Sequence, residues 1–337
     1  KWLTNPVFAY IGKRSYGIYL YQYPVMIFYE SKVKNISNNL WLHTVIELLL
    51  IMICAELSYQ LVDKRMKNFD YSKTWQTVKG WFTPPILSKQ KPFLLPGLVL
   101  VLVSVVGFVI APTNHVTAEQ QRMQEQILKN REIAEASKKK AKEEASKTTD
   151  SSDKEAAAKS EAQLKQVATN YDLSLEEVKS AEKLQFTAFG DSVMLGAAQG
   201  LKDVFPNAVV DADISRQIWN SSDLIESLAK QDLLYDPVLI GLGTNGDFSD
   251  AQFDSFIKLF GNRQVYWVNV HAPSLRLQNV VNDHLNEMAQ KYGNLTIIDW
   301  HTYASNGSAD WFYEDGIHVT PKGLIAYVKL ISEALNK

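Results

Sequence analysis

Four polar side chains could together catalyse acyl transfer: two follow segments that have the composition of buried strands, and two stand just before the last predicted helix. They belong to three short motifs, Gly190-Asp191-Ser192, Gly243-Thr244-Asn245-Gly246 and Asp315-Gly316-Ile317-His318. A carboxylate three residues before a histidine can fix the tautomer of the imidazole, whose second nitrogen then faces a nucleophile. We therefore interpret Ser192 as the nucleophile, His318 as the general base and Asp315 as the residue that orients the imidazole.

Each motif alone also has a structural explanation. Asp191 or Ser192 would be a good N-cap for the helix-like segment that follows. Asn245 is common in turns, and Asp315 with His318 could form a polar loop before the last helix. The catalytic interpretation is favoured because all three motifs fall at one edge of the same predicted sheet, in the order Ser, Asn, Asp, His.

From residue 184 onward, strand-like and helix-like segments alternate. The predicted strands are 185–189, 208–214, 237–242, 265–270 and 295–300, and the predicted helices include 250–260, 278–292 and 320–336. This alternation is typical of right-handed crossovers and of a parallel sheet covered on both faces. We predict a three-layer α/β fold with a flavodoxin-like, doubly wound parallel sheet, in which ligands bind beyond the carboxyl ends of the strands.

The first third of the chain has the composition of membrane helices. Residues 93–111 carry no charge, and a helix of that length extends about 28 Å, close to the thickness of the bilayer hydrocarbon. Residues 15–29 and 41–61 are also apolar, but the second segment contains Glu47 and Glu56, which must face protein or water at membrane depth. We predict two helices of a polytopic bundle followed by one more transmembrane helix; for 93–111 the alternative is a buried core helix.

The basic residues predict the orientation of these helices. Residues 64–92 contain seven lysines and arginines and one acid, Asp70, so this loop should be cytoplasmic and everything after residue 111 should lie outside. The chain begins at Lys1, within a hydrophobic segment, and we expect it to be the C-terminal portion of a longer protein.

The segment between the last predicted span and the α/β part is rich in charge. Residues 129–160 contain no aromatic residue and one large apolar residue, Ile133. Because such a segment cannot bury a core of its own, we predict a solvated tether that is partly helical or disordered, with an interruption at 148–153. An anionic wall polymer or lipid headgroup is an alternative partner for its lysines. Ser174 and Glu177 form the pattern of a capping box, which predicts a short helix.

The average composition excludes several classes of protein. The chain has 337 residues, and its 35 basic and 37 acidic residues give a net charge of -2, which argues against nucleic-acid binding through a basic field. The single cysteine, Cys54, excludes a scaffold of intramolecular disulfides. We predict no metal site, because the other histidines lack the spacing of metal ligands; they are His43, His115, His271, His284 and His301.

The three motifs resemble those of the SGNH or GDSL-type esterases and acyltransferases, over residues 185–337. The resemblance implies an oxyanion hole formed by the backbone N–H groups of Ser192 and Ser215 and by the side-chain amide of Asn245. Ser215 stands where the superfamily usually has glycine, but a serine N–H can donate equally well. Three residues at the same edge of the sheet are candidates for the acceptor site: Gly243, Thr244 and His271.

Residues 10–66 resemble the last helices of acyltransferase-3 membrane domains, although Gln22 stands where many members have histidine. Such helices, a further span, a tether and an outer SGNH domain form the layout of the peptidoglycan O-acetyltransferases of Gram-positive bacteria. The predicted parts are the last acyltransferase-3 helices (1–66), a cytoplasmic loop (67–92), a transmembrane helix (93–111), an extracytoplasmic linker (112–183) and an SGNH acyltransferase domain (184–337).

The resemblance implies a multi-pass protein of the bacterial cell membrane that confers lysozyme resistance. Its outer domain would transfer acetyl groups to the C6 hydroxyl of N-acetylmuramic acid in peptidoglycan glycan strands, with residual esterase activity. The acetyl group would come from cytoplasmic acetyl-CoA through the chain's own acyltransferase-3 helices, and the SGNH domain would bind no cofactor. The alternatives are a carbohydrate esterase or deacetylase, an O-acyltransferase of teichoic acid or exopolysaccharide, and a wall-binding module without chemistry.

Overall fold

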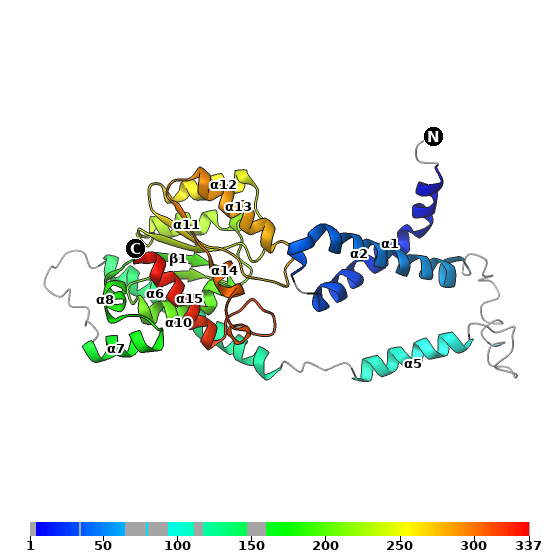
Figure 1. The fold of residues 1–337 in the computed structure, drawn as a ribbon, viewed down its shortest axis with the longest axis horizontal. Helices are drawn as coiled ribbons and strands as arrows, with labels where there is room; N and C mark the ends of the chain where they lie inside the picture. The colour runs from blue at the N-terminus through cyan, green and yellow to red at the C-terminus, as the bar shows by residue number, and fades with distance from the viewer. Residues whose placement is uncertain are drawn as a thin grey trace. The chain divides into compact units, whose positions relative to one another are not determined.

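The computed structural model of the chain describes residues 5–33, 35–64, 79, 94–110, 117–146 and 160–336 (Figure 1). The chain divides into two compact units, one of Lys1–Tyr29 with Leu42–Val116 and one of Glu30–Trp41 with Thr117–Lys337. The predicted cytoplasmic loop at 67–92, apart from Lys79, and the predicted helix interruption at 148–153 lie outside the described residues.

Apolar helices make up the first part of the chain. They are α1 (Pro6–Lys32), η1 (Ile36–Asn39), α2 (Leu40–Ser58), a π-helical turn η2 (Tyr59–Asp63) and α5 (Leu94–Ile110). Within the part of the chain that the structure describes, the helical run Ile36–Asp63 is the one long and apolar enough to cross a membrane, with a mean hydropathy of 1.9. In α5, which confirms the helix predicted at 93–111, Val99–Ile110 is a shorter apolar stretch.

Both acids of the second apolar helix contact protein. Arg14 of α1 is buried and forms an ion pair with Glu56, and its guanidinium lies over the rings of Tyr10 and Tyr59, 3.5 and 4.5 Å from their centroids. Glu47 is only 3% exposed. Both positions agree with the prediction that these acids face protein rather than lipid, where an unpaired charge would be costly.

A five-stranded parallel sheet is the centre of the second unit. Its strands are β1 (Thr187–Gly190), β2 (Val209–Ala212), β3 (Val238–Gly241), β4 (Val265–Val268) and β5 (Leu295–Ile298). They are ordered β2-β1-β3-β4-β5, with Gly190 of β1 in register with Ala212 of β2 and with Gly241 of β3. This order confirms the predicted flavodoxin-like sheet, in which successive strands are added on one side of β1 and then on the other, from β3 onward.

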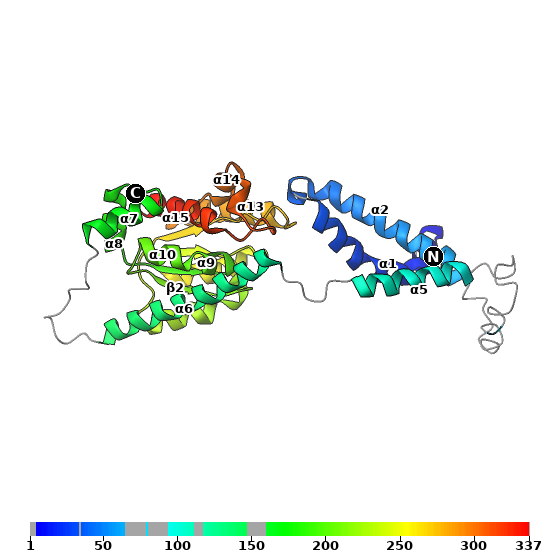
Figure 2. The ribbon, with the colours of Figure 1, turned by 90° about the horizontal axis from the view of Figure 1, so that it is seen from below.

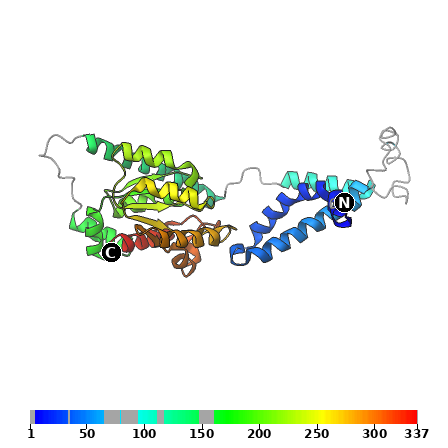
Figure 3. The same ribbon diagram turned by 90° about the horizontal axis from the view of Figure 1, so that it is seen from above.

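Helices cover both faces of the sheet (Figures 1 and 3). One face packs on α9 (Ser192–Gly196), α10 (Ala198–Val204), α14 (Trp300–Ser305) and α15 (Pro321–Leu335). The other packs on α11 (Ser222–Lys230), α12 (Asp250–Ile257) and α13 (Gln278–Lys291). Short 3₁₀ turns complete the unit: η4 (Ile218–Asn220), η5 (Lys258–Phe260) and η6 (Ala309–Trp311). The predicted helices at 250–260, 278–292 and 320–336 are confirmed.

The charged segment before the sheet was predicted at 129–160 as a solvated tether that is partly helical. The helix is confirmed, but the solvated tether is wrong for residues 129–146, because they pack against the sheet. They belong to α6 (Ala118–Ser146), which lies along the edge strand β2 (Figure 2). Its buried positions are Asn130, Ala134, Ser137 and Ala141, spaced three and four residues apart on one face of the helix. Small side chains let the helix approach the sheet edge closely, and the long lysines remain at its sides.

Two further helices connect α6 to β1. They are α7 (Glu161–Asn170) and α8 (Leu175–Lys183), and each begins with a capping box. The capping box predicted at Ser174 is confirmed, because its hydroxyl accepts the backbone N–H of Glu177 and the Glu177 carboxylate accepts the backbone N–H of Ser174.

Candidate active site

The candidate nucleophile lies on the tight turn between β1 and α9. Gly190 ends the strand, and a Cβ atom there would lie 2.3 Å from Cβ of Met194 and 2.9 Å from the carbonyl oxygen of Gly241. Only glycine fits this approach. Asp191 is the N-cap of α9 and accepts the backbone N–H of Val193 at 3.0 Å. The cap and the candidate nucleophile are therefore different residues, and the Ser192 hydroxyl does not cap the helix.

Three side chains form one hydrogen-bonded line at this turn. Nε2 of His318 lies 2.9 Å from Oγ of Ser192, and Nδ1 of His318 lies 2.6 Å from Oδ2 of Asp315. The serine is 9% exposed, so its hydroxyl is reached from one side. The structure brings together the serine, the histidine and the aspartate that the sequence motifs predicted.

The protonation of this line follows from the environment of Asp315. Burial alone would raise the pKa of its carboxyl, but hydrogen bonds from the His318 ring and from the backbone N–H groups of Ile317 and His318 outweigh burial and lower the pKa. An ionised carboxylate can only accept, so Nδ1 of His318 carries the hydrogen. Nε2 is then free to accept the hydroxyl proton of Ser192.

The loop after β2 begins beside the loop after β1, because the backbone N–H of Asp213 donates to the Gly190 carbonyl at 3.2 Å. Two residues further on, Ser215 has a left-handed backbone with φ of 58°. Glycine adopts such a φ without strain, and serine does so at a cost. Ser215 is exposed, so its backbone N–H lies on the surface side of this loop.

Asn245 lies between the two loops. Its Nδ2 group donates to Oδ2 of Asp191 at 3.4 Å and to the carbonyl oxygen of Arg216 at 3.3 Å. Both contacts are long, so the amide is held loosely. An oxyanion could replace either acceptor with little loss of hydrogen bonding.

A small cavity of about 10 Å³ lies beneath the nucleophile turn, lined in part by Asp191, Thr244 and His271. Burial raises the pKa of Asp191 to about 6, although hydrogen bonds from Val193 and Thr244 oppose the shift. The cavity has room for about one water molecule, far less than a sugar ring.

The predicted acceptor residues lie close to this cavity rather than on an open groove. Gly243 has φ of 127°, and a Cβ atom there would lie 2.8 Å from Val281, so glycine is required by the backbone. His271 stacks on Phe312 with ring centroids 4.6 Å apart, and burial lowers its pKa to about 4. A role of Gly243, Thr244 and His271 in acceptor binding stays a prediction.

The described residues hold no set of side chains that could together bind a metal ion. Among residues 5–33, 35–64, 79, 94–110, 117–146 and 160–336, no group of three or more His, Cys, Asp or Glu side chains lies close enough to hold a metal ion.

One residue at this site was missed in the sequence. Arg216 is 8% exposed, and its backbone carbonyl accepts from Asn245. Its place directly after Ser215 puts it near the site, but a charged residue in a loop predicts exposure, so the sequence gives no signal for its burial.

Comparison with known proteins agrees with the acyl-transfer chemistry that the geometry allows. No protein-family model matches the chain. The chain is similar over nearly its whole length to peptidoglycan O-acetyltransferases. YrhL of Bacillus subtilis strain 168, whose name marks it as a candidate peptidoglycan O-acetyltransferase, is 29% identical over 340 residues, which are 97% of this chain and 52% of YrhL. The peptidoglycan O-acetyltransferase OatA of Listeria monocytogenes is 27% identical over 333 residues, again 97% of this chain and 52% of the relative.

A solved structure is also similar to the second unit. The C-terminal catalytic domain of peptidoglycan O-acetyltransferase A of Streptococcus pneumoniae, with a methylsulfonyl adduct, is 22% identical with a TM-score of 0.40, and the match covers 45% of this chain and 89% of that domain. The resemblance stated from the motifs is confirmed by the whole-chain similarity to YrhL and OatA. The chain spans about half the length of these curated relatives.

Proposed function

We propose that this chain acetylates the C6 hydroxyl of N-acetylmuramic acid in peptidoglycan through an acetyl ester of Ser192. The observation that carries the proposal is the line from Asp315 through His318 to Ser192, with contacts of 2.6 and 2.9 Å at the carboxyl edge of the sheet. The names of YrhL and OatA support peptidoglycan as the acceptor.

In the first half-reaction, Oγ of Ser192 attacks the carbonyl carbon of the acetyl donor while Nε2 of His318 takes the hydroxyl proton. The tetrahedral oxyanion is stabilised by the N–H groups of Ser192 and Ser215 and by the amide of Asn245, where loss of one donor typically costs about 3 to 4 kcal/mol of barrier. The bond to the donor group then breaks, that group takes the proton from His318, and acetyl-Ser192 remains.

In the second half-reaction, the sugar hydroxyl attacks the acetyl carbonyl carbon and gives its proton to His318. The Ser192 oxygen leaves and regains a proton from the imidazolium. Asp315 stabilises that imidazolium in both halves and stays ionised. Water in place of the sugar gives hydrolysis by the same steps, which predicts residual esterase activity and makes an esterase the alternative function.

The apolar helices supply the acetyl group in this proposal. Acetyl-CoA on the cytoplasmic side is the ultimate donor. The acyltransferase-3 helices of this multi-pass protein pass the acetyl group to its outer domain. Support comes from the membrane-length helical run Ile36–Asp63 and from the basic composition of residues 64–92.

The test uses residues 1–337 in detergent with an activated acetyl ester, with and without oligosaccharides of N-acetylglucosamine and N-acetylmuramic acid. A transferase consumes the ester faster when sugar is added and forms acetylated sugar. Ser192→Ala should abolish both reactions, whereas Ser305→Ala, which removes an exposed hydroxyl on α14, should change neither. Ester consumption that ignores the sugar and yields free acetate would establish the esterase instead.

The acceptor is tested in cells. Mass spectrometry of muropeptides from a strain that expresses the protein, compared with one that expresses Ser192→Ala, should show acetyl groups on muramic acid in the first strain alone. Acetyl groups found on teichoic acid or exopolysaccharide, with unmodified muramic acid, would reject peptidoglycan as the acceptor and retain the chemistry.

A further inference from the structure

A buried ion pair shapes the loop that carries Ser215. The guanidinium of Arg216 donates through Nη1 to the backbone carbonyl of Asp211 at 2.5 Å and through Nη2 to Oδ1 of Asp211 at 2.8 Å. Both side chains are about nine-tenths buried, and the guanidinium lies 4.3 Å from the ring centroid of Phe189. The loop therefore folds back onto the end of β2, which fixes the path of Ser215 between its two ends.

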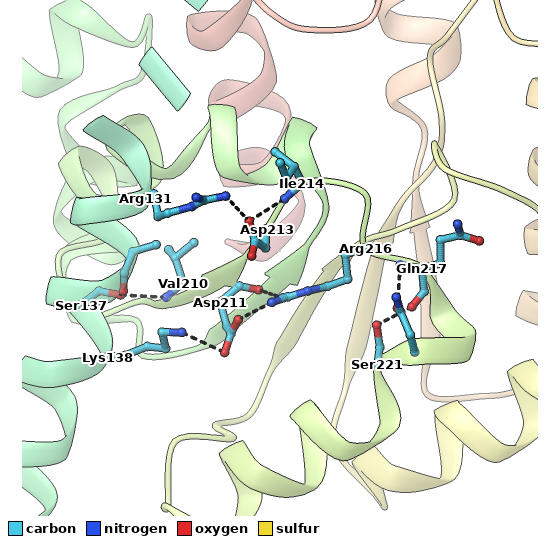
Figure 4. Close-up of polar contacts among 12 residues, drawn as sticks. Arg131, Ser137, Lys138, Val210, Asp211, Asp213, Ile214, Arg216, Gln217 and Ser221 are labelled. Carbon is cyan, nitrogen blue, oxygen red and sulfur yellow. Dashed lines mark hydrogen bonds and ion pairs between the residues drawn. The ribbon is translucent and has the colours of Figure 1, made fainter. Parts of the chain in front are cut away.

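Helix α6 holds the same loop from the outside (Figure 4). Lys138 donates to Oδ2 of Asp211 at 3.2 Å, the carboxylate oxygen that Arg216 leaves free. About two helical turns earlier, Arg131 donates to Oδ1 of Asp213 at 2.5 Å. Residues seven apart lie on one face of a helix, so a single face of α6 contacts both acids, Asp211 in β2 and Asp213 in the loop.

The helix is also bonded to the strand itself. The backbone N–H of Val210 in β2 donates to Oγ of Ser137 at 3.1 Å, and this hydroxyl donates to the carbonyl of Ala134 at 2.7 Å. An edge strand has unpaired backbone groups, and α6 satisfies one of them. The position of α6 along β2, and hence that of Lys138, is thereby fixed.

The other end of this network reaches the candidate oxyanion amide. The carbonyl of Arg216 accepts from Asn245 at 3.3 Å, so the residue that pairs with Asp211 also contacts the Asn245 amide. A continuous chain of contacts leads from Lys138 on α6 through Asp211 and Arg216 to Asn245 and, along the backbone, to Ser215.

We propose that Lys138, Asp211 and Arg216 are positioning residues that hold the oxyanion donors of Ser215 and Asn245, and that α6 is part of the catalytic unit. This inference rests on the proposed function of the Ser192 site. With Lys138 in place, both oxygens of Asp211 face a cation, and the loop has one arrangement. Without the Lys138 charge, the carboxylate can turn, and the donors lose their alignment with the developing charge.

The test compares Lys138→Met with Lys139→Met in residues 1–337, using hydrolysis of an activated acetyl ester. Both variants remove one lysine charge from α6, but Lys139 is exposed and takes no part in the network. We expect Lys138→Met to lower kcat about 10- to 100-fold with KM within about threefold, the scale expected for misplaced catalytic donors. Lys139→Met should leave both constants unchanged.

Four more variants separate positioning from general stability. Lys138→Arg keeps the charge and should retain most of kcat, and Lys138→Gln serves as the neutral variant if the methionine variant is unstable. Arg216→Lys should lower kcat by a similar factor, because a lysine cannot make both contacts to Asp211. In the double variant of Lys138→Met with Arg216→Lys, the effects should be less than multiplicative.

The outcomes distinguish this inference from the proposed function. If Ser192→Ala abolishes hydrolysis while Lys138→Met and Arg216→Lys leave kcat unchanged, or if Lys139→Met is as impaired as Lys138→Met, the positioning role is wrong. If Ser192→Ala itself retains full hydrolysis, the proposed function fails, and the network has no oxyanion site to position.

Discussion

Asp315 binds His318 at two points. Its Oδ2 lies 2.6 Å from the ring Nδ1, and its Oδ1 accepts the backbone N–H of the same histidine at 3.0 Å. The side chain and the backbone of His318 are therefore fixed by one carboxylate, and the ring cannot turn without breaking a charge-assisted hydrogen bond. The three-residue spacing of the Asp-x-x-His motif allows one carboxylate to contact both the backbone and the ring of His318.

We predict that Asp315→Asn inactivates the enzyme without unfolding it. The amide oxygen of asparagine can still accept the backbone N–H groups of the loop, but its NH₂ group favours the wrong tautomer of the imidazole. From the effect of this change in other Ser-His-Asp sites, kcat for ester hydrolysis should fall about 10³- to 10⁴-fold. Steady-state kinetics and circular dichroism check the two halves of the prediction, and a fall of less than tenfold would contradict it.

A second prediction concerns the support of the His318 loop. A Cβ atom at Gly323 in α15 would lie 2.0 Å from the carbonyl oxygen of Trp311, which accepts the backbone N–H of Thr320. Gly323→Ala should therefore separate the helix from the loop and destabilise the second unit by about 3 kcal/mol or more. Hydrogen exchange of peptides from the sheet, measured in the whole chain, gives this difference in opening free energy.

The matched control is Gly196→Ala in α9. A Cβ atom there meets nothing within 4 Å, and alanine is the better helix former by about 1 kcal/mol. The control should leave the sheet as stable as before or slightly more so. Equal destabilisation by both substitutions would show that the contact with Trp311 is not the cause.

The sequence predicts the line of Ser192, His318 and Asp315 well because each residue follows a strand or precedes a helix that the local pattern identifies. Parallel strands bring their carboxyl ends to one edge, so Ser192 and His318 could be placed together although 126 positions separate them. Helix α6 could not be placed in the same way. Its buried face consists of alanine, serine and asparagine, which do not stand out by hydropathy, and its partners Asp211 and Asp213 are remote in sequence.

The burial of Arg216 could not be predicted from the sequence either. Charge in a loop predicts exposure, and only the fold shows that the guanidinium is enclosed between Asp211 and the Phe189 ring. The left-handed φ of Ser215 could not be predicted either, because serine rarely adopts it unless surrounding contacts impose it.

A third prediction follows from the raised pKa of Asp191. Between its usual pKa near 3.8 and about 6, the folded protein keeps a proton that the unfolded chain has lost. The stability that this group contributes is therefore complete below pH 3.8 and is lost as the pH rises to 6, by roughly 3 kcal/mol. In Asp191→Asn this loss should disappear, so the free energy of unfolding of the variant should rise relative to that of the parent protein between pH 4 and 6. The exposed Asp283→Asn is the control and should show no such gain; hydrogen exchange across this range supplies the measurement.

His271 should show the opposite dependence on pH. Burial and the charge of His301 lower its pKa to about 4, so between pH 6.5 and 4 the unfolded chain binds a proton that the folded protein excludes. The stability contributed by the neutral ring is complete above pH 6.5 and is lost as the pH falls to 4, by up to about 3 kcal/mol. His271→Gln should remove this loss on the acid side. The same variant tests the predicted role in acceptor binding: a weaker sugar-dependent acceleration with unchanged ester hydrolysis supports that role, whereas equal loss of both reactions means that His271 only maintains the packing against Phe312.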